Sequence, residues 1–146
     1  MEKQTGFFQL YLRIAIGIGY LVPGLDRLGV WGPNGGKNIS WGDWQHFLKY
    51  ATEVMSFLPE PVINVFAVIA TAGEIVFGTL LLVGKWTRIA ALGSGVLAFL
   101  FAASMTISFG IVSPLSYSVF VVSAGSFLLS AMTRYKWSID DGFRSK

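Results

Sequence analysis

The chain alternates between long apolar segments and short polar ones. Four apolar runs cover residues 6–29, 61–84, 89–112 and 114–133. Each run approaches the roughly 20 residues that an α-helix needs to cross about 30 Å of hydrocarbon. A segment inside lipid must satisfy its own backbone hydrogen bonds, and the alternation typical of membrane barrel strands is missing from these runs. The pattern therefore predicts four transmembrane α-helices.

The composition supports an all-α membrane protein with a single domain over residues 1–146. Hydrophobic residues make up 53% of the chain and charged residues only 13%, whereas soluble domains carry roughly 25% charged residues. A chain this short cannot hide so much apolar surface inside its own core. We therefore expect a four-transmembrane-helix bundle surrounded by a lipid bilayer.

The segment between the first two runs, residues 30–60, is too long for a simple turn. Ser40 and Asp43 resemble a capping box, which opens helices. Apolar residues then recur at helical spacing, namely Trp44, Phe47, Leu48, Ala51, Met55 and Leu58. This pattern predicts an amphipathic helix on the outer membrane surface that ends before Pro59. The helix would either cap the bundle or form a lid over a site that opens outward.

Lysine and arginine are unevenly divided between the two ends of the predicted bundle. Three lie on the side of the long loop: Arg27, Lys37 and Lys49. Seven lie on the other side: Lys3, Lys85, Arg88, Arg134, Lys136, Arg144 and Lys146. By the positive-inside rule, both termini should be cytoplasmic and the long loop extracytoplasmic.

Two charged residues fall inside the predicted spans, Arg13 and Glu74. A charge within the bilayer costs at least a few kcal/mol and usually has a partner or a function. If residue 6 and Gly84 mark the inner ends of their helices, Arg13 lies roughly 10 Å deep and Glu74 roughly 15 Å deep. We therefore predict an Arg13–Glu74 ion pair, which would either fix the register of two helices or bind a polar or anionic group.

Other polar and small residues lie near this predicted pair. Tyr20 shares a helical face with Arg13, because seven residues make about two turns, and Gln9 lies one turn from Arg13. Small residues such as Gly17 and Gly78 lie at similar depth. They would either allow the helices to pack closely or leave a cavity around the charges.

The residue types restrict the redox chemistry that the chain could support. The chain has no cysteine, and its single histidine, His46, lies in the long loop. Asp140 and Asp141 belong to a charged tail rather than to a metal-ligand cluster. We therefore expect no haem, metal or iron–sulfur centre, and electron transfer would need a bound organic carrier such as a membrane quinone. The net charge of +3 is modest, and no nucleic-acid partner is expected.

Two spaced motifs in the first three runs are similar to those of a known family. The first motif reads Arg13-x3-Gly17-x2-Tyr20-x3-Gly24-x2-Arg27. The second reads Glu74-x3-Gly78-x5-Gly84-x3-Arg88-Ile-Ala-Ala91. Together they closely resemble the DoxX family of four-helix bacterial membrane proteins, which is related to the DoxD subunit of thiosulfate:quinone oxidoreductase. The family pattern usually ends its first motif in lysine, where this chain has Arg27.

This resemblance implies a redox-associated subunit or partner of a quinone-linked membrane oxidoreductase in the bacterial cytoplasmic (inner) membrane. Such a protein would work beside a protein partner and interact with a quinone or small anion at the intramembrane Arg/Glu site. The candidate binding residues are Arg13, Glu74, Tyr20, Gln9 and Arg27. The alternative is a non-enzymatic scaffold or a lipid- or small-molecule-binding protein. The sequence leaves open the substrate, the partner, the oligomeric state and whether the chain is itself catalytic.

Overall fold

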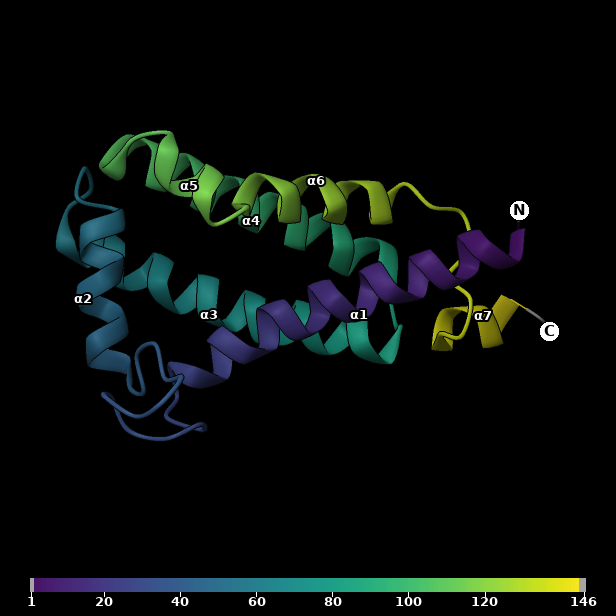
Figure 1. The fold of residues 1–146 in the computed structure, drawn as a ribbon, viewed down its shortest axis with the longest axis horizontal. Coiled ribbons are helices and arrows are strands. Elements are labelled where there is room, and N and C mark those ends of the chain that lie inside the picture. The colour runs from purple at the N-terminus through teal and green to yellow at the C-terminus, as the bar shows by residue number, and fades with distance from the viewer. Residues whose placement is uncertain (1, 145–146) are drawn as a thin grey trace.

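The computed structural model describes residues 2–144, and all the regular structure in this range is helical. Four helices run along the length of the molecule (Figure 1): α1 (Glu2–Asp26), α3 (Glu60–Val83), α4 (Thr87–Phe109) and α6 (Val119–Ser130). Helix α1 packs against α3, α3 against α4, and α4 against α6. The short helix α2 (Trp44–Val54) crosses one end, and α7 (Ile139–Arg144) lies at the other end beside the start of α1. The all-α bundle expected from the sequence is confirmed.

Three helical segments are long and apolar enough to cross a bilayer: Gln4–Asp26, Glu60–Val83 and Thr87–Phe109. Large apolar side chains are exposed along all three, for example Ile18, Phe66 and Phe99. A bundle in water would leave this surface unfavourably hydrated, whereas lipid tails solvate it. The protein is therefore a multi-pass membrane protein.

The fourth apolar run is not one continuous helix, so the prediction of an uninterrupted span over 114–133 is wrong. It is divided into α5 (Val112–Ser116) and α6, and the part after residue 130 leaves the helix. Ser118 separates the two helices with a left-handed φ of 56°, a conformation that side chains with a Cβ rarely adopt. The amide of Ser118 still donates to the carbonyl of Leu115. The break therefore leaves this backbone donor satisfied inside the apolar segment.

The amphipathic helix of the long loop is present as α2. The Asp43 side chain accepts a hydrogen bond from the His46 amide at 2.9 Å, so Asp43 is its N-cap. Ser40 takes no part in the cap. The apolar face of α2 packs against α3 instead of lying on lipid, with Phe47 and Ala51 in one cluster with α3 residues. We expected this helix to be either a cap on the bundle or a lid over a site, and its packing agrees with the cap. The helix ends at Val54.

Helices α1 and α3 cross where two glycines face each other. A Cβ on Gly78 would lie 2.9 Å from the carbonyl oxygen of Gly17, and a Cβ on Gly17 would lie 3.1 Å from the carbonyl oxygen of Gly78. Real Cβ atoms rarely approach a neighbour so closely. These glycines therefore serve close helix packing, which fixes the register of α1 against α3.

Candidate functional site

A buried ion pair joins the end of α1 to the second half of α3. Arg27 follows the last residue of α1 and is only 4% exposed. Its Nη1 lies 2.9 Å from Oε2 of Glu74, and its Nη2 donates to Oε1 of Glu74 at 3.1 Å. The Nη1 atom also donates to the hydroxyl of Thr71 at 2.9 Å. The two Nη atoms of this guanidinium therefore find partners within the protein, whereas its Nε has no hydrogen-bond partner within residues 2–144.

Aromatic rings from the long loop cover this pair. The guanidinium carbon of Arg27 lies 3.8 Å from the centroid of the Phe47 ring and 5.1 Å from that of the Trp41 ring. The Asp26 carboxylate accepts hydrogen bonds from the amides of Ser40 and Trp41, which ties the loop to the end of α1. Cation–π contacts of this kind stabilise a desolvated cation. Arg27 thus connects α1, α2 and α3.

The predicted ion pair between Arg13 and Glu74 is therefore wrong, since Glu74 pairs with Arg27. The reason is the register of the two helices. Gly17 faces Gly78, and the two helices are antiparallel. Glu74, four residues before Gly78, therefore lies at the level of Leu21, four residues after Gly17. At about 1.5 Å per residue, this level is roughly 12 Å from that of Arg13 and roughly 9 Å from that of Arg27.

Arg13 instead contacts the segment after α6, at the end of the bundle that holds the start of α1 and α7. It is 2% exposed, and its Nη2 donates to the carbonyl oxygen of Trp137 at 2.7 Å. Within residues 2–144, its Nε and Nη1 atoms have no hydrogen-bond partner. Gln9, one turn earlier on the same face, is 1% exposed, and both atoms of its amide are also without a partner in that range. Two neighbouring buried side chains thus retain unused hydrogen-bonding groups.

The segment that contacts Arg13 also caps α4. The Asp140 carboxylate accepts hydrogen bonds from the amides of Trp86 and Thr87, at 2.9 and 2.8 Å. Partial burial raises the pKa of Asp140, whereas these hydrogen bonds and the charge of Arg13 lower it. The lowering effects together outweigh the effect of burial, so the pKa lies below its ordinary value. Asp140 is therefore a structural cap, not the member of a free charged tail that the sequence suggested. A signal existed, because Trp86 at the N-cap position of α4 offers no capping oxygen.

Tyr20 lies between the two arginines on the buried side of α1. Its hydroxyl donates to the carbonyl oxygen of Ser94 on α4 at 2.5 Å. The structure thus brings Arg27 and Glu74 into contact, places Gln9 beside Arg13 on one helical face, and uses Tyr20 to join α1 to α4. Four of the five predicted candidates thus form two separate sites, one in the first half of α1 and one at its end, and Tyr20 lies between them.

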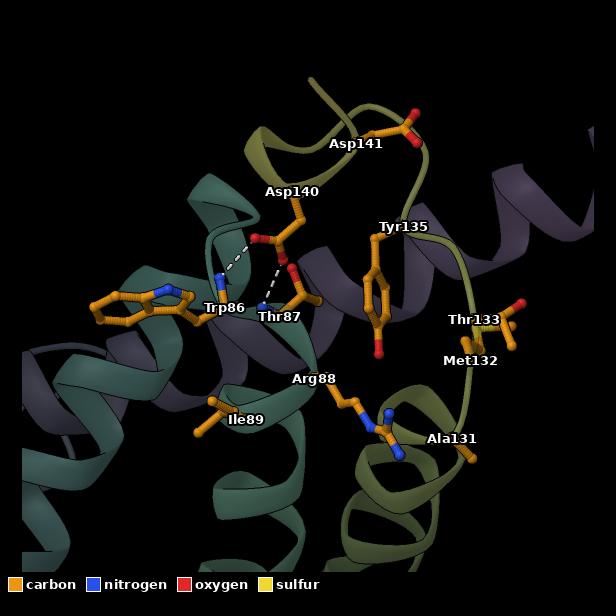
Figure 2. A pocket seen from close by; sticks show the side chains of 10 residues that line it. All are labelled: Trp86, Thr87, Arg88, Ile89, Ala131, Met132, Thr133, Tyr135, Asp140 and Asp141. Carbon is orange, nitrogen blue, oxygen red and sulfur yellow. Dashed lines mark hydrogen bonds between the residues drawn. The ribbon is translucent and has the colours of Figure 1, made fainter. Parts of the chain in front are cut away.

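A separate pocket of about 570 Å³ lies at the end of the bundle that holds α7 (Figure 2). It is lined by the first turn of α4, the residues that follow α6, and the first turn of α7. None of the five predicted candidates lines this pocket. Its charged lining residues are Arg88, Asp140 and Asp141.

Comparison with known families gives one match. The DoxX family model matches residues 8–109, which is more than half of the chain and includes α2, α3, α4 and most of α1. Both spaced motifs, from Arg13 to Arg27 and from Glu74 to Ala91, lie inside the matched range. No curated protein and no solved structure matches the chain. The match, together with the apolar helical bundle, shows that the chain is a membrane protein that belongs to the DoxX family.

Proposed function

We propose that this protein is a redox-associated membrane protein that binds the head group of a membrane quinone beside Gln9 and Arg13. The observation that carries the proposal is the set of unpartnered groups on these two buried side chains. An isolated polar group in an apolar interior costs several kcal/mol unless it finds a hydrogen-bond partner. A ligand with acceptor oxygens would remove that cost.

The free groups suit a carbonyl-bearing ligand. Arg13 has unused N–H donors on Nε and Nη1, and Gln9 adds an amide N–H next to them. Hydrogen bonds from a charged donor are the strong ones, so Arg13 would contribute most of the affinity. Phe7, Phe8 and Tyr11 are exposed on the lipid side of the same helix. They offer an apolar surface on which the tail of a quinone could lie.

In this proposal the other three candidates organise the bundle. The Arg27–Glu74 pair joins α1 to α3, and Tyr20 joins α1 to α4. Together they hold α1 in the position that presents Gln9 and Arg13. Electrons would be exchanged between the bound quinone and a partner oxidoreductase, so the protein would work in a membrane complex.

The test is quinone binding by the purified protein. A short-tailed benzoquinone is titrated against the wild type, Arg13→Gln and Gln9→Leu. A charged hydrogen bond is worth about 1.5–3 kcal/mol, so Arg13→Gln should weaken binding roughly tenfold or more. Gln9→Leu should have a smaller effect. Arg134→Gln is the matched control, because Arg134 is an exposed cation that pairs only at 3.9 Å with Asp141.

Two results would change this assignment. Unaltered quinone affinity in both Arg13→Gln and Gln9→Leu would contradict the proposed site. If sulfate displaces the quinone analogue from the wild type but not from Arg13→Gln, the physiological ligand is a small oxyanion.

A non-enzymatic scaffold is the second candidate. The observation that favours it is the Arg27–Glu74 pair, which is bonded to Thr71 and covered by aromatic rings. An intramembrane charge pair of this kind can specify helix arrangement without binding a ligand. Co-purification of a partner complex that survives Arg13→Gln, without any quinone in the organic extract, would support this reading.

The orientation forms part of the proposal. The start of α1, the turn between α3 and α4, and α7 all lie at one end of the bundle (Figure 1). Lys85, Arg88, Arg134 and Lys136 belong to this end, while Lys146 lies outside the described residues. We place this end in the cytoplasm of a bacterial inner membrane. An impermeant thiol reagent should label a cysteine at position 37, but not one at 146, in intact cells; the reverse pattern would invert the orientation.

A further inference from the structure

The pocket of Figure 2 lies at the end of the bundle where α4 begins and α6 has ended. One side is apolar: Ile89 is 66% exposed, and Ala131 and Met132 follow the end of α6. The other side carries the capping carboxylate of Asp140. A ligand in this pocket would therefore have an apolar part and a charged part.

A tryptophan marks the depth of the pocket. Trp86 lines it, is 61% exposed, and has the ammonium of Lys85 at 5.0 Å from its ring centroid. Tryptophan prefers the level of lipid head groups, because its ring is apolar and its N–H is polar. The pocket thus lies beside the head groups of one leaflet.

Charges of opposite sign line the two sides of the pocket. In Figure 2 the guanidinium of Arg88 extends toward Ala131, while Asp140 lies on the other side of the pocket, in α7. No ion pair joins Arg88 to a carboxylate of the residues that the structure describes. Asp141 is partly neutralised by Arg134 at 3.9 Å. A ligand would thus meet one unpaired cation and one carboxylate.

We infer that this pocket binds the head group of a zwitterionic phospholipid with a primary ammonium, its phosphate on Arg88 and its ammonium on Asp140. Arginine is well suited to phosphate because its N–H groups can form two parallel hydrogen bonds. The carboxylate of Asp140 keeps unused lone pairs after it accepts two backbone amides. A head group with net negative charge would be repelled by Asp140 and Asp141.

The volume and position agree with this assignment. Pockets for small ligands measure about 300–1,000 Å³, and this one measures about 570 Å³. The acyl chains would follow the exposed side of α4 below Ile89, where Leu92, Val96 and Phe99 face outward. The pocket is lined by none of the residues of the proposed quinone site, although the charge of Arg13 also acts on Asp140.

The experiment measures lipid retention by native mass spectrometry after delipidation in detergent. Phosphatidylethanolamine, its N-methylated forms, phosphatidylcholine and phosphatidylglycerol are added separately to the wild type. Phosphatidylcholine has the same phosphate but no N–H donor for Asp140. We expect the wild type to retain phosphatidylethanolamine roughly three- to tenfold better than phosphatidylcholine, with a stepwise loss along the methylation series.

Two variants and a control locate the site. Arg88→Gln should reduce retention of phosphatidylethanolamine roughly tenfold. Ala131→Phe fills the pocket without a change of charge and should have a similar effect. Lys85→Gln makes the same charge change on a residue outside the pocket lining and should retain lipid as the wild type does.

Three results would overturn the inference. Equal retention of phosphatidylethanolamine and phosphatidylcholine would remove the role of Asp140. Preferred retention of phosphatidylglycerol would show that the site selects net negative charge. An equal loss in Lys85→Gln and Arg88→Gln, with none in Ala131→Phe, would show general charge attraction with no pocket involved.

Discussion

Two buried arginines, one in the middle of α1 and one just past its end, have different surroundings. Arg27 has a carboxylate, a hydroxyl and two aromatic rings around its guanidinium. Arg13 is buried as deeply, yet it has one hydrogen bond, to Trp137, and two nitrogen atoms without a partner in the described part of the chain. The comparison separates two uses of a buried cation. An arginine paired with a carboxylate holds helices together, whereas one without such a pair can receive a ligand.

The largest loss of stability should come from breaking the Arg27–Glu74 pair. Glu74→Gln leaves the charge of Arg27 without its counter-ion in an apolar site, and such losses typically cost about 3–5 kcal/mol. The free energy of unfolding can be measured by titration of mixed micelles with sodium dodecyl sulfate. The double variant Arg27→Met/Glu74→Leu should recover most of the loss, because it removes both charges. If Glu74→Gln unfolds like the wild type, the pair does not stabilise the bundle.

The next largest loss of stability should come from a substitution at the contact between Gly17 and Gly78, which sets the register of α1 against α3. Gly78→Ala forces its new methyl group toward the carbonyl oxygen of Gly17, so it should destabilise the protein by about 1–3 kcal/mol. Gly19→Ala is the matched control on α1, since a Cβ there would have no neighbour within 4 Å. The same unfolding titration compares the two. A greater loss in Gly19→Ala would show that α1 packs differently.

A smaller loss of stability is expected when the cap of α4 is removed. Asp140→Ala removes the cap of α4 and should cost about 0.5–2 kcal/mol. The folded-state pKa of Asp140 lies below its ordinary value. Its contribution is therefore full above the unfolded-state pKa of about 3.9 and is lost as the pH falls through the lower folded-state value.

The effect of pH on stability tests whether Asp140 caps α4 through its charge. The stability difference between the wild type and Asp140→Ala should shrink in titrations at and below about pH 4. Asp140→Asn keeps a capping oxygen but does not titrate, so it should lack this extra acid sensitivity. A difference that is constant over the whole pH range would mean that the carboxylate does not act through its charge.

The smallest change in stability should come from replacing Arg13. Arg13→Met loses one hydrogen bond but also removes the desolvation cost of a poorly satisfied cation, so stability should change by less than about 1 kcal/mol without ligand. A loss as large as that in Glu74→Gln would show that Arg13 is as well satisfied as Arg27. Added quinone analogue should stabilise the wild type against unfolding and leave Arg13→Met unchanged.

The sequence predicted most of the fold because hydrophobic length and helix signals act locally. Three spans and the capped helix after Asp43 followed from such signals. The break at Ser118 did not, because the run around it stays apolar and Ser118 is not a residue type that marks a left-handed turn. Family membership was also correct, since the two motifs carry a spacing that a match over residues 8–109 supports.

The partners of the charged residues could not be predicted from the sequence to the same degree. Estimates of depth place a residue to within a turn or two, and the distance between the levels of Arg13 and Glu74 is of that size. Only the Gly17–Gly78 contact fixes the register and assigns Glu74 to Arg27. The missing capping oxygen at Trp86 indicates that α4 needs an acceptor from elsewhere, but the acceptor, Asp140, comes from more than 50 residues away and no local pattern identifies it.

The short helix α6 has a consequence for the surrounding bilayer. Its 12 residues extend only about 18 Å, against roughly 30 Å of hydrocarbon. The break at Ser118 shortens the regular apolar wall on the α5–α6 side, whereas α3 and α4 are long enough to cross. The protein therefore presents unequal hydrophobic thickness around its circumference. Acyl chains beside α6 should compress locally, so a thicker bilayer should place greater strain on that side than on the side of α3.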